Sequence, residues 1–553
     1  MMQESKKRVL VFSTNYFPNI GGAEVAIKEI TDRLPNYTFE LICARLETKL
    51  PSEEKVGNVL VHRLGFGSSL DKLLIPFWGV FKIWQINHSR PVKLFWSVMV
   101  SYASCAAYFY NAFKFWRPIP AVLTLQEGDS EEHLTKRYFG LLDMTWRLSV
   151  LHSNVVTALS NYLANRARRF GYRGEPYVVP NGVSDDYFTE RKTRDDGKTI
   201  ITTSRLVHKN GVDTLVRAMA LLPKHNLLIA GDGKERKNLE ALVKELKIGS
   251  RVKFLGTVSR EDLPKLLSSA DIFCRPSRSE GQGVSFMEAM AVGLPVIAPP
   301  VGGIPDFLRD PSTDSGQAPT GLFCQVDDPE SIAEKVRLLA SDKNLRIKII
   351  GNAKKLMIDK YRWLGIAESM GQVFETVVTN KPTILLAAGI YPPDPGGPAL
   401  HAQRYFEEFP KHGFSCRLVS FRDYRKYPKG ISHFLYTCAL ARTTMGADII
   451  YAFDTLSSGV PSLIISTIFR IPFVVRIGGD ALWERATEIS KNPISLTSFY
   501  QYSLHRGKLN FYIIFIVVSA AKKIIVPAQI LKDIYIKHYG IKNSDIIVVP
   551  NPI

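Results

Sequence analysis

The chain of 553 residues has little cysteine and no paired cysteine motif. Its six cysteines are Cys43, Cys105, Cys274, Cys324, Cys416 and Cys438. Because no C-x-x-C pair is among them, the sequence predicts neither a zinc site nor a disulfide framework. Scattered single cysteines favour a reducing, cytoplasmic compartment.

The chain also lacks an apolar run long enough to cross a bilayer. The longest apolar stretch, residues 92–113, is interrupted by Lys93 and by polar side chains, and residues 511–521 are too short. We expect 92–113 to form a strand and a packed helix, and we expect no transmembrane helix. The apolar run after Lys6 to Arg8 is likewise shorter than the core of a signal peptide.

Positive charge, in contrast, is abundant. The chain has 71 Lys and Arg against 52 Asp and Glu, a formal charge of +19. Residues 381–553 hold 20 of the basic and 11 of the acidic residues, so the excess is spread along the chain. No helix-turn-helix or RNP-like pattern accompanies it. If the charge has a specific meaning, it favours an anionic membrane face or a phosphate-bearing substrate over nucleic acid.

Short apolar runs alternate with amphipathic segments. This β-α-β alternation predicts an α/β protein with two doubly wound parallel sheets. The expected strands are VLVFS, FELICA, VLVHRL, LFWSVMV, AVLTLQ, VVTALS and YVVP, and then TIITTS, NLLIAG, VKFLG, DIFCRP, PVIAPP and GLFCQV. The polar segment 189–198 suggests a boundary between domains 1–190 and 191–378. Residues 330–378 are expected to be helical, with Trp363 as a packing anchor.

Three short motifs occur twice, in the same order. The pairs are YFPNIGGAE (16–24) with YPPDPGGPA (391–399), Gly128-Asp129 with Gly479-Asp480, and YVVPNGV (177–183) with IVVPNPI (547–553). The repeat predicts that residues 379–553 form a third Rossmann-like domain, a second copy of the first. We expect this copy to be the beginning of an incomplete second enzyme or an interaction module.

The segment 279–303, SEGQGVSFMEAMAVGLPVIAPPVGG, carries the strongest functional signal. It has two carboxylates, Glu280 and Glu288, and glycines follow the first. We expect Glu288 to open a short apolar helix that ends at Gly293. A carboxylate here is suited to sugar or ribose hydroxyls, and glycine amides at a helix N-terminus are suited to phosphate. The segment therefore predicts a nucleotide-sugar pocket.

Five stretches, taken in order, resemble family 4 of the retaining nucleotide-sugar glycosyltransferases, which have the GT-B fold. They are FPNIGGAE, VVPNGV, SRLVHKNGVDTL, AGDGKERKNLE and SEGQGVSFMEAMAVGLPV. The resemblance spans residues 8–378, and residues 379–553 resemble only that family's N-terminal, acceptor-side domain. It implies transfer of a sugar from a nucleotide-diphosphate sugar, with retention of anomeric configuration and without metal or cofactor. No D-x-D motif follows an expected strand, in agreement with a metal-free site.

The resemblance also assigns roles to individual residues. It implies that Glu288 binds the ribose hydroxyls, that Glu280 lies near the donor sugar, and that Arg205 and Lys209 offset charge on the diphosphate. The family's lysine usually stands directly before a glycine, whereas here Asn210 does and Lys209 is one place earlier. Lys209 is therefore either a phosphate ligand reached by a shifted path or a surface charge.

Glycine-rich turns make up the rest of the expected donor site. The donor-binding residues besides Glu288 are Gly21, Gly22, Gly231, Gly233, Gly281, Gly283 and Val284. Glycine allows a backbone amide to approach a ligand closely, although each of these positions could also be an ordinary tight turn.

The acceptor side departs from the family. Many members have a histidine after the strand that corresponds to AVLTLQ, whereas this chain has Gln126-Glu127-Gly128-Asp129. Gln126 and Glu127 are expected to face the acceptor, and Asp129 to act as a base or to hold an acceptor hydroxyl. The alternative is that Gly128-Asp129 forms a turn that caps the next helix.

Together these features predict a glycosyltransferase whose acceptor is a lipid-linked or surface glycan. We expect it to be cytoplasmic, with peripheral contact to the anionic inner face of the cell membrane. Two other classes remain open: a nucleotide-sugar epimerase of GT-B fold, and a non-catalytic scaffold that binds sugar nucleotides.

Overall fold

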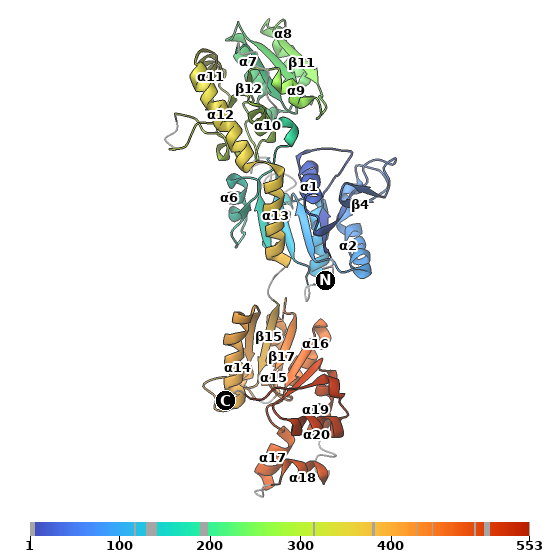
Figure 1. The fold of residues 1–553 in the computed structure, drawn as a ribbon. Helices are drawn as coiled ribbons and strands as arrows, with labels where there is room; N and C mark the ends of the chain where they lie inside the picture. Colours follow the sequence, from blue (N-terminus) through green and yellow to red (C-terminus); the bar gives the residue numbers. More distant parts are fainter. Residues whose placement is uncertain are drawn as a thin grey trace. The chain divides into compact units, whose positions relative to one another are not determined.

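The computed structural model describes residues 6–114, 118–128, 141–188, 197–312, 316–378, 382–428, 430–444, 446–490, 494–502 and 509–551. Contacts divide the chain into two compact units. The first comprises residues 1–110 and 119–378, and the second includes residues 379–553. Figure 1 traces both units in sequence order.

The first unit begins with an eight-stranded sheet of order β3-β4-β2-β1-β5-β6-β7-β8. Its strands are β1 (Lys7–Phe12), β2 (Tyr37–Ala44), β3 (Glu53–Val56), β4 (Val59–Leu64), β5 (Leu94–Val98), β6 (Ala121–Leu125), β7 (Val155–Ala158) and β8 (Tyr177–Val178). The helices between them are α1 (Gly22–Asp32), α2 (Asp71–Ser89), α3 (Tyr102–Phe113), α5 (Leu141–Leu151) and α6 (Asn161–Arg169). The expected strands and the strand–helix reading of 92–113 are confirmed. The antiparallel strand β3, EEKV, was missed because its charged and partly exposed residues have no apolar signal.

A second, six-stranded parallel sheet completes the first unit, with order β11-β10-β9-β12-β13-β14. Its strands are β9 (Thr199–Thr203), β10 (Asn226–Ala230), β11 (Val252–Gly256), β12 (Ile272–Cys274), β13 (Val296–Ala298) and β14 (Leu322–Phe323). Its helices are α7 (Val212–Ala220), α8 (Arg236–Glu245), α9 (Leu263–Ser268), α10 (Val284–Val292), α11 (Pro329–Ser341) and α12 (Lys343–Lys360). The predicted class, α/β with doubly wound parallel sheets, is confirmed.

The last helix of this unit, α13 (Trp363–Val378), packs against the first sheet rather than the second. Its Phe374 ring lies 5.3 Å from that of Trp96 on β5. Trp363 is 4% exposed, as expected of an anchor, and a Cβ at Gly182 would lie 2.8 Å from its ring. Sequence alone had grouped α13 with the second sheet, because periodicity shows which face of a helix is apolar but not which sheet that face covers.

The second unit contains a six-stranded parallel sheet of order β16-β15-β17-β18-β19-β20. Its strands are β15 (Thr383–Ala388), β16 (Ser415–Ser420), β17 (Ile449–Ala452), β18 (Phe473–Arg476), β19 (Lys523–Val526) and β20 (Ile546–Val548). Its α-helices are α14 (Gly397–Glu408), α15 (Ile431–Thr443), α16 (Gly459–Phe469), α17 (Ala481–Ser490), α18 (Leu496–Gln501), α19 (Leu509–Ala520) and α20 (Gln529–Tyr539). The strand order is the one that a repeat of β2-β1-β5-β6-β7-β8 predicts. The repeat and the domain boundaries stay predictions.

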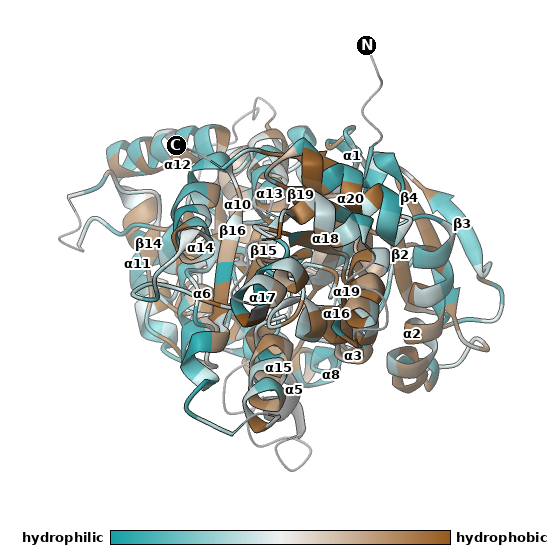
Figure 2. Cartoon of the chain, turned by 90° about the horizontal axis from the view of Figure 1, so that it is seen from below, coloured by the Kyte–Doolittle hydropathy of each residue, from teal (hydrophilic) through white to brown (hydrophobic). Residues whose placement is uncertain are grey.

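Helix α2 presents large apolar side chains to solvent. Phe77 is 70% exposed, Phe81 60% and Trp84 50%, and Leu70 and Leu73 continue the same line towards its N-terminus. The helix is correspondingly rich in hydrophobic residues in Figure 2. Among the described residues, no helix combines the length and the apolar character needed to cross a membrane.

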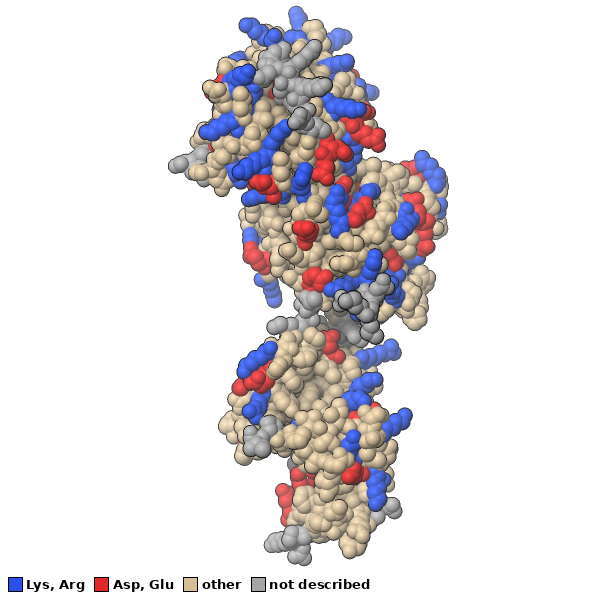
Figure 3. Space-filling view, viewed as in Figure 1, with Lys and Arg blue, Asp and Glu red and all other residues tan. Residues whose placement is uncertain are grey.

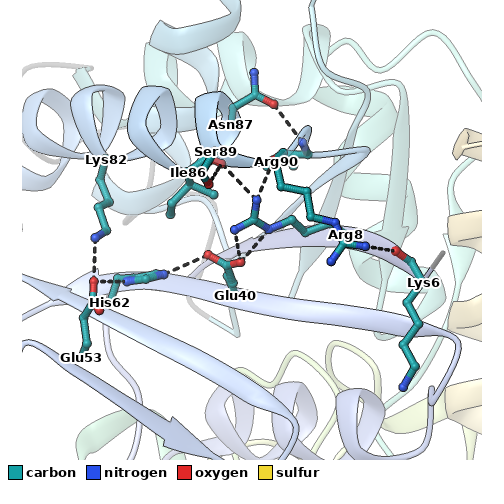
Figure 4. Close-up of polar contacts among 11 residues, drawn as sticks. Lys6, Arg8, Glu40, Glu53, His62, Lys82, Ile86, Asn87, Ser89 and Arg90 are labelled. Atoms are coloured by element: carbon teal, nitrogen blue, oxygen red, sulfur yellow. Dashed lines mark hydrogen bonds and ion pairs between the residues drawn. The ribbon is translucent and has the colours of Figure 1, made fainter.

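A polar network fixes α2 to the first sheet (Figure 4). Arg8 Nε donates to Glu40 Oε1 at 2.6 Å, and the guanidinium also donates to two carbonyls at the end of α2. His62 lies between Glu40 and Glu53, at 3.0 and 2.8 Å, and Lys82 of α2 donates to Glu53 at 2.7 Å. Burial acts to raise the pKa of Glu40, but hydrogen bonds from His62 and Arg8 hold it below its ordinary value.

Candidate functional site

Loops from the two sheets of the first unit meet beyond the carboxyl ends of their strands, where α/β folds place ligand sites. Ser279 Oγ, after β12, donates to the carbonyl of Gly128, after β6, at 2.9 Å. Ser160 Oγ, after β7, donates to the carbonyl of Gly281 at 2.7 Å. The structure therefore brings the segment that contains Glu280 against the loop that was expected to face the acceptor.

The two loops approach so closely that side chains are excluded between them. A Cβ on Gly128 would lie 2.8 Å from the backbone nitrogen of Gly281. A Cβ on Gly281 would lie 3.2 Å from Gly128 Cα. The contact between the loops is therefore a sufficient reason for glycine at both positions, and a ligand contact by Gly281 stays a prediction.

Glu280 is held by a basic residue that sequence reasoning missed. Arg275, 6% exposed, pairs through Nη2 with Glu280 Oε2 at 2.6 Å and donates through Nη1 to Ser285 Oγ at 2.7 Å. Its guanidinium also lies over the Phe286 ring, 4.2 Å from the centroid. Burial lowers the pKa of Arg275, and the charges of Glu280 and Glu288 oppose that shift. A basic residue directly after the apolar strand DIFC was the signal that could have identified it.

Glu288 is a buried carboxylate within α10. The helix begins at Val284, after Gly283 with φ +93°, so Glu288 is its fifth residue and does not open it as expected. Glu288 is only 9% exposed. Burial raises its pKa, while Arg260, the Tyr187 hydroxyl and Arg275 act to lower it. The ionised form is thus incompletely compensated, which suits a carboxylate that receives hydroxyl donors from a ligand.

Arg205 and Lys209 lie in the loop between β9 and α7, beside the loop of Glu280. The backbone nitrogen of Arg278 donates to the Lys209 carbonyl at 2.7 Å. The Arg278 side chain also bonds Asp213 at the start of α7, with Nη2 2.8 Å from Oδ2. Arg205 is exposed, and its carbonyl accepts from the Asn210 amide at 2.7 Å. The segments that carry Arg205, Lys209 and Glu280 are therefore joined, as a shared diphosphate site requires.

Gly231 and Gly233 have a structural explanation. A Cβ on Gly231, whose φ is +135°, would lie 1.9 Å from the Ser204 carbonyl oxygen, and one on Gly233 would lie 2.4 Å from that of Leu206. Both glycines therefore let their turn pack on the loop that carries Arg205. A direct contact with the nucleotide stays a prediction for both.

The acceptor-side residues are only partly described. Asp129 lies outside the described residues, and Gln126 is half-buried. Glu127 is 6% exposed, and its carboxylate accepts from the backbone nitrogens of Val100 and, at 3.0 Å, Gln126. Burial raises the pKa of Glu127 to about 7. The carboxylate is thus engaged with the backbone, and its contact with an acceptor stays a prediction.

The exposed N-terminus of α1 carries Gly21 and Gly22. Gly21 donates through its backbone nitrogen to Glu24 Oε2 at 2.8 Å. A Cβ on Gly22 would meet no atom within 4 Å. In contrast to Gly128 and Gly281, no close contact within the described residues requires glycine at position 22. The contact of Gly22 with the donor stays a prediction.

Replacing Gly22 with alanine should therefore lower donor affinity without lowering the stability of the fold. We expect the melting temperature to remain within a few degrees, since alanine is tolerated at a helix start, and donor affinity to fall at least about tenfold because the methyl group blocks close approach. The matched control is Gly249→Ala, which also points into open space. Calorimetric titration with the donor measures the effect, and wild-type affinity in Gly22→Ala would remove this glycine from the site.

A cavity of about 330 Å³ lies between residues 207–217 and α8, beside the loop that carries Lys209. None of the predicted site residues lines it. The candidate site therefore rests on the convergence of loops and charges rather than on this cavity.

Two family models match consecutive parts of the first unit. Residues 20–187 match Glycosyltransferase Family 4, and residues 183–356 match Glycosyl transferases group 1. An uncharacterised glycosyltransferase of Methanocaldococcus jannaschii is 37% identical over 185 residues, which are 33% of this chain and 46% of that protein.

A second relative has a more specific name. The GDP-mannose-dependent monoacylated alpha-(1-6)-phosphatidylinositol monomannoside mannosyltransferase of Corynebacterium glutamicum is 30% identical over 254 residues, covering 41% of this chain and 63% of that protein. The chain thus covers less than two thirds of the length of either relative.

Solved structures support the fold. Sucrose-phosphate synthase from Thermosynechococcus elongatus aligns with a TM-score of 0.58 at 20% identity, over 67% of this chain and 98% of that one. At this identity the likeness concerns the fold alone, and it agrees with the two-sheet GT-B architecture.

Proposed function

We propose that residues 1–378, a GT-B glycosyltransferase unit by its fold and by both family matches, move a sugar from a nucleotide-diphosphate sugar to an acceptor with retention of anomeric configuration. The observation that carries the proposal is the buried carboxylate of Glu288 on α10, together with the contacts that join the loop of Arg205 to the loop of Glu280. A carboxylate can accept hydrogen bonds from the hydroxyls of a ribose or a sugar, and a basic side chain can offset the charge of a diphosphate.

In the proposed complex, the Glu288 carboxylate accepts hydrogen bonds from the ribose hydroxyls. Arg205 and Lys209 offset the charge that develops on the leaving diphosphate, together with backbone amides at the N-terminus of α10. The ion pair with Arg275 holds the Glu280 side chain in place, so that the Glu280 carboxylate is oriented before the sugar binds. Residues 126–128 close the other side of the sugar.

Retention follows if attack and departure occur on the same face of the sugar. The bond from the anomeric carbon to the diphosphate oxygen breaks, and the acceptor oxygen bonds to that carbon from the same side. The acceptor proton passes to an oxygen of the leaving diphosphate, so no strong protein base is needed. This fits a chain that has Gln126 where many relatives have a histidine.

The direct test is a screen of nucleotide sugars with the full-length protein, without acceptor and then with lipid-phosphate glycans. A transferase releases nucleoside diphosphate slowly by hydrolysis and faster with the right acceptor. An epimerase, the alternative function, converts the sugar without releasing diphosphate. Sugar rearrangement alone would therefore contradict the proposal.

A lipid-linked acceptor at an anionic membrane is the acceptor class that we propose. The Corynebacterium relative is named for a phosphatidylinositol mannoside, and Lys and Arg side chains are spread over the face of the chain in Figure 3. Between residues 64 and 126 the only acid is Asp71, which is 2% exposed and binds backbone nitrogens at the start of α2. The basic residues of this stretch are Lys72, Lys82, Arg90, Lys93, Lys114 and Arg117.

The exposed line of α2 is the surface that we propose for this contact. An amphipathic helix that lies in a bilayer surface combines a buried apolar face with attraction of its basic residues to anionic lipid. The polar network around Glu40 and His62 would hold α2 in place as it docks. We propose an anionic bilayer as the partner of this surface, because residues 64–126 contain basic residues and no exposed acid.

The double variant Phe77→Ser/Phe81→Ser is expected to bind anionic vesicles at least about tenfold more weakly, since two aromatic side chains no longer enter the interface. Leu364→Ser is the control, because Leu364 is 61% exposed on α13 and equally apolar. Vesicle sedimentation measures both variants. Equal binding of the double variant and the wild type would exclude α2 as the docking surface.

A further inference from the structure

The second unit contains a buried arginine whose charge no acid balances in the described contacts. Arg476, the last residue of β18, is 2% exposed. Its Nη2 donates to the Asn551 side-chain oxygen at 2.9 Å and to the Val549 carbonyl at 3.3 Å. Nε and Nη1 are shielded from solvent and have no hydrogen-bond partner among the described residues. Three N–H groups of a buried cation are therefore unused.

Aromatic neighbours do not complete this environment. The Tyr405 ring centroid lies 5.7 Å from the guanidinium. The Tyr451 hydroxyl lies close enough to the guanidinium for the positive charge and a weak hydrogen bond with Arg476 to oppose the rise in its pKa that burial causes. No contact of ordinary hydrogen-bond geometry satisfies Nε or Nη1 among the described residues. Both residues are neutral, so the charge stays uncompensated.

Two acids in loops of the second unit, Asp480 and Asp454, make their described hydrogen bonds to groups other than Arg476. Asp480 accepts from the backbone nitrogens of Leu482 and Trp483 and from the Tyr500 hydroxyl. Asp454 accepts from the serines and backbone nitrogens of its own turn. Burying a charge without an opposite partner is costly on the scale of a domain's whole stability. Because no described contact stabilises this buried charge, we infer that a bound anion does.

Arg476 lines a cavity at the N-terminus of α14. The cavity has about 40 Å³ open to small molecules, and its lining consists of Gly397, Pro398, His401, Phe453, Arg476, Gly478 and Asn551. That volume holds roughly three waters, about the size of one phosphate group. No carboxylate is in the lining, and the first-turn amides of α14 other than Pro398, which has no N–H, add partial positive charge. Burial and the charges of Arg476 and Arg404 lower the pKa of His401, as expected where the potential is positive.

The first unit shows that the fold itself does not need this arginine. Aligning Gly479-Asp480 with Gly128-Asp129 places Arg476 opposite Leu125, the last residue of β6, and Gly478 opposite Glu127. Leu125 is completely buried. At one strand position, then, the first unit has a leucine and the second an arginine, and the neighbouring buried carboxylate is absent from the second.

From the buried cation, the cavity and the helix N-terminus together, we propose that the second unit binds a phosphate-type oxyanion, as a phosphomonoester or diphosphate, between Arg476 and the start of α14. The phosphate belongs either to a soluble phosphoester or to a lipid headgroup. The inference is independent of the transferase proposal, because its residues lie in the other unit.

Equilibrium dialysis of the full-length protein against inorganic phosphate measures how many phosphates bind per chain, and this number tests the site. Arg476→Leu installs the residue of the first unit and is expected to bind one phosphate fewer per chain. Arg442→Leu, which removes an exposed arginine of α15, is the control and should bind as the wild type does. Because the leucine removes an uncompensated charge, the thermal midpoint should stay equal or rise in phosphate-free buffer.

A second variant leaves the arginine in place. Gly397→Ala adds a methyl group where no atom lies within 4 Å, at the mouth of the cavity, and should weaken this one site at least about tenfold. Displacement of bound phosphate by methyl phosphate identifies a soluble phosphoester, and displacement only by phosphatidic acid vesicles identifies a lipid. Unchanged stoichiometry in both variants, or displacement by neither competitor, would overturn the proposal.

Discussion

Replacing Glu288 with glutamine is expected to weaken binding of the donor's nucleoside diphosphate about 100-fold. A buried carboxylate that accepts two ribose hydroxyls makes charge-assisted hydrogen bonds, each about 1.5–3 kcal/mol, and a neutral amide retains one acceptor and faces the second hydroxyl with a donor. Calorimetric titration with the nucleoside diphosphate measures this loss. The control Glu334→Gln changes a carboxylate that is 69% exposed and should leave affinity unchanged.

The same substitution should not destabilise the unliganded protein. Since burial raises the pKa of Glu288 in the folded state, protonation favours folding, and that contribution is present below the unfolded pKa and lost as pH rises through the folded one. Glu288→Gln removes this loss, so the variant should melt at the same temperature or higher at pH 8. Donor affinity of the wild type should fall as pH decreases and the carboxyl becomes protonated. Wild-type affinity in Glu288→Gln would contradict the assignment.

Replacing Gly128 with alanine is expected to lower transfer about 100-fold while nucleotide affinity changes little. The new Cβ would lie 2.8 Å from the Gly281 nitrogen, and because that atom belongs to the backbone, the two loops must separate. A displacement of about 1 Å at a reacting centre can cost 10²-fold in rate. Glu288, in contrast, lies within α10, seven residues after Gly281.

Steady-state kinetics with the donor identified by the screen separates these effects, as a fall in kcat at nearly constant nucleotide affinity. Gly365→Ala is the control, because a Cβ there meets nothing within 4 Å. Activity of Gly128→Ala within twofold of the wild type would show that contact between the two loops is not needed for transfer.

The sheets could be predicted because their strands are short apolar runs between amphipathic helices. β3 could not, since its charged residues pair only with β4 at an edge and have no apolar pattern. The helix α13 was predicted as a helix, but its sheet was not, because Trp363 and Phe374 reach partners far away in the sequence. Long-range packing of this kind leaves no mark on local periodicity.

In the candidate site, too, local sequence predicted some residues and long-range contacts determined others. Glu280 and Glu288 were predicted as site residues from the residues around them, and that assignment stays a prediction. Arg275 was not predicted, because its ion pair with Glu280 exists only in the fold. Similarly, Gly281 was predicted to bind the donor and Gly128 was offered only as part of a turn, whereas the structure shows that the two glycines pack against one another. Arg476 had no signal in the sequence, because its burial and its unsatisfied N–H groups appear only in the fold.

The most direct test of the central claim is hydrogen–deuterium exchange of the full-length protein with and without the nucleoside diphosphate of the donor that it turns over. The account predicts new protection of backbone amides in residues 204–211 and 279–292, and loss of that protection in Glu288→Gln. Protection confined to other segments, or unchanged protection in the variant, would contradict the claim that this segment holds the donor.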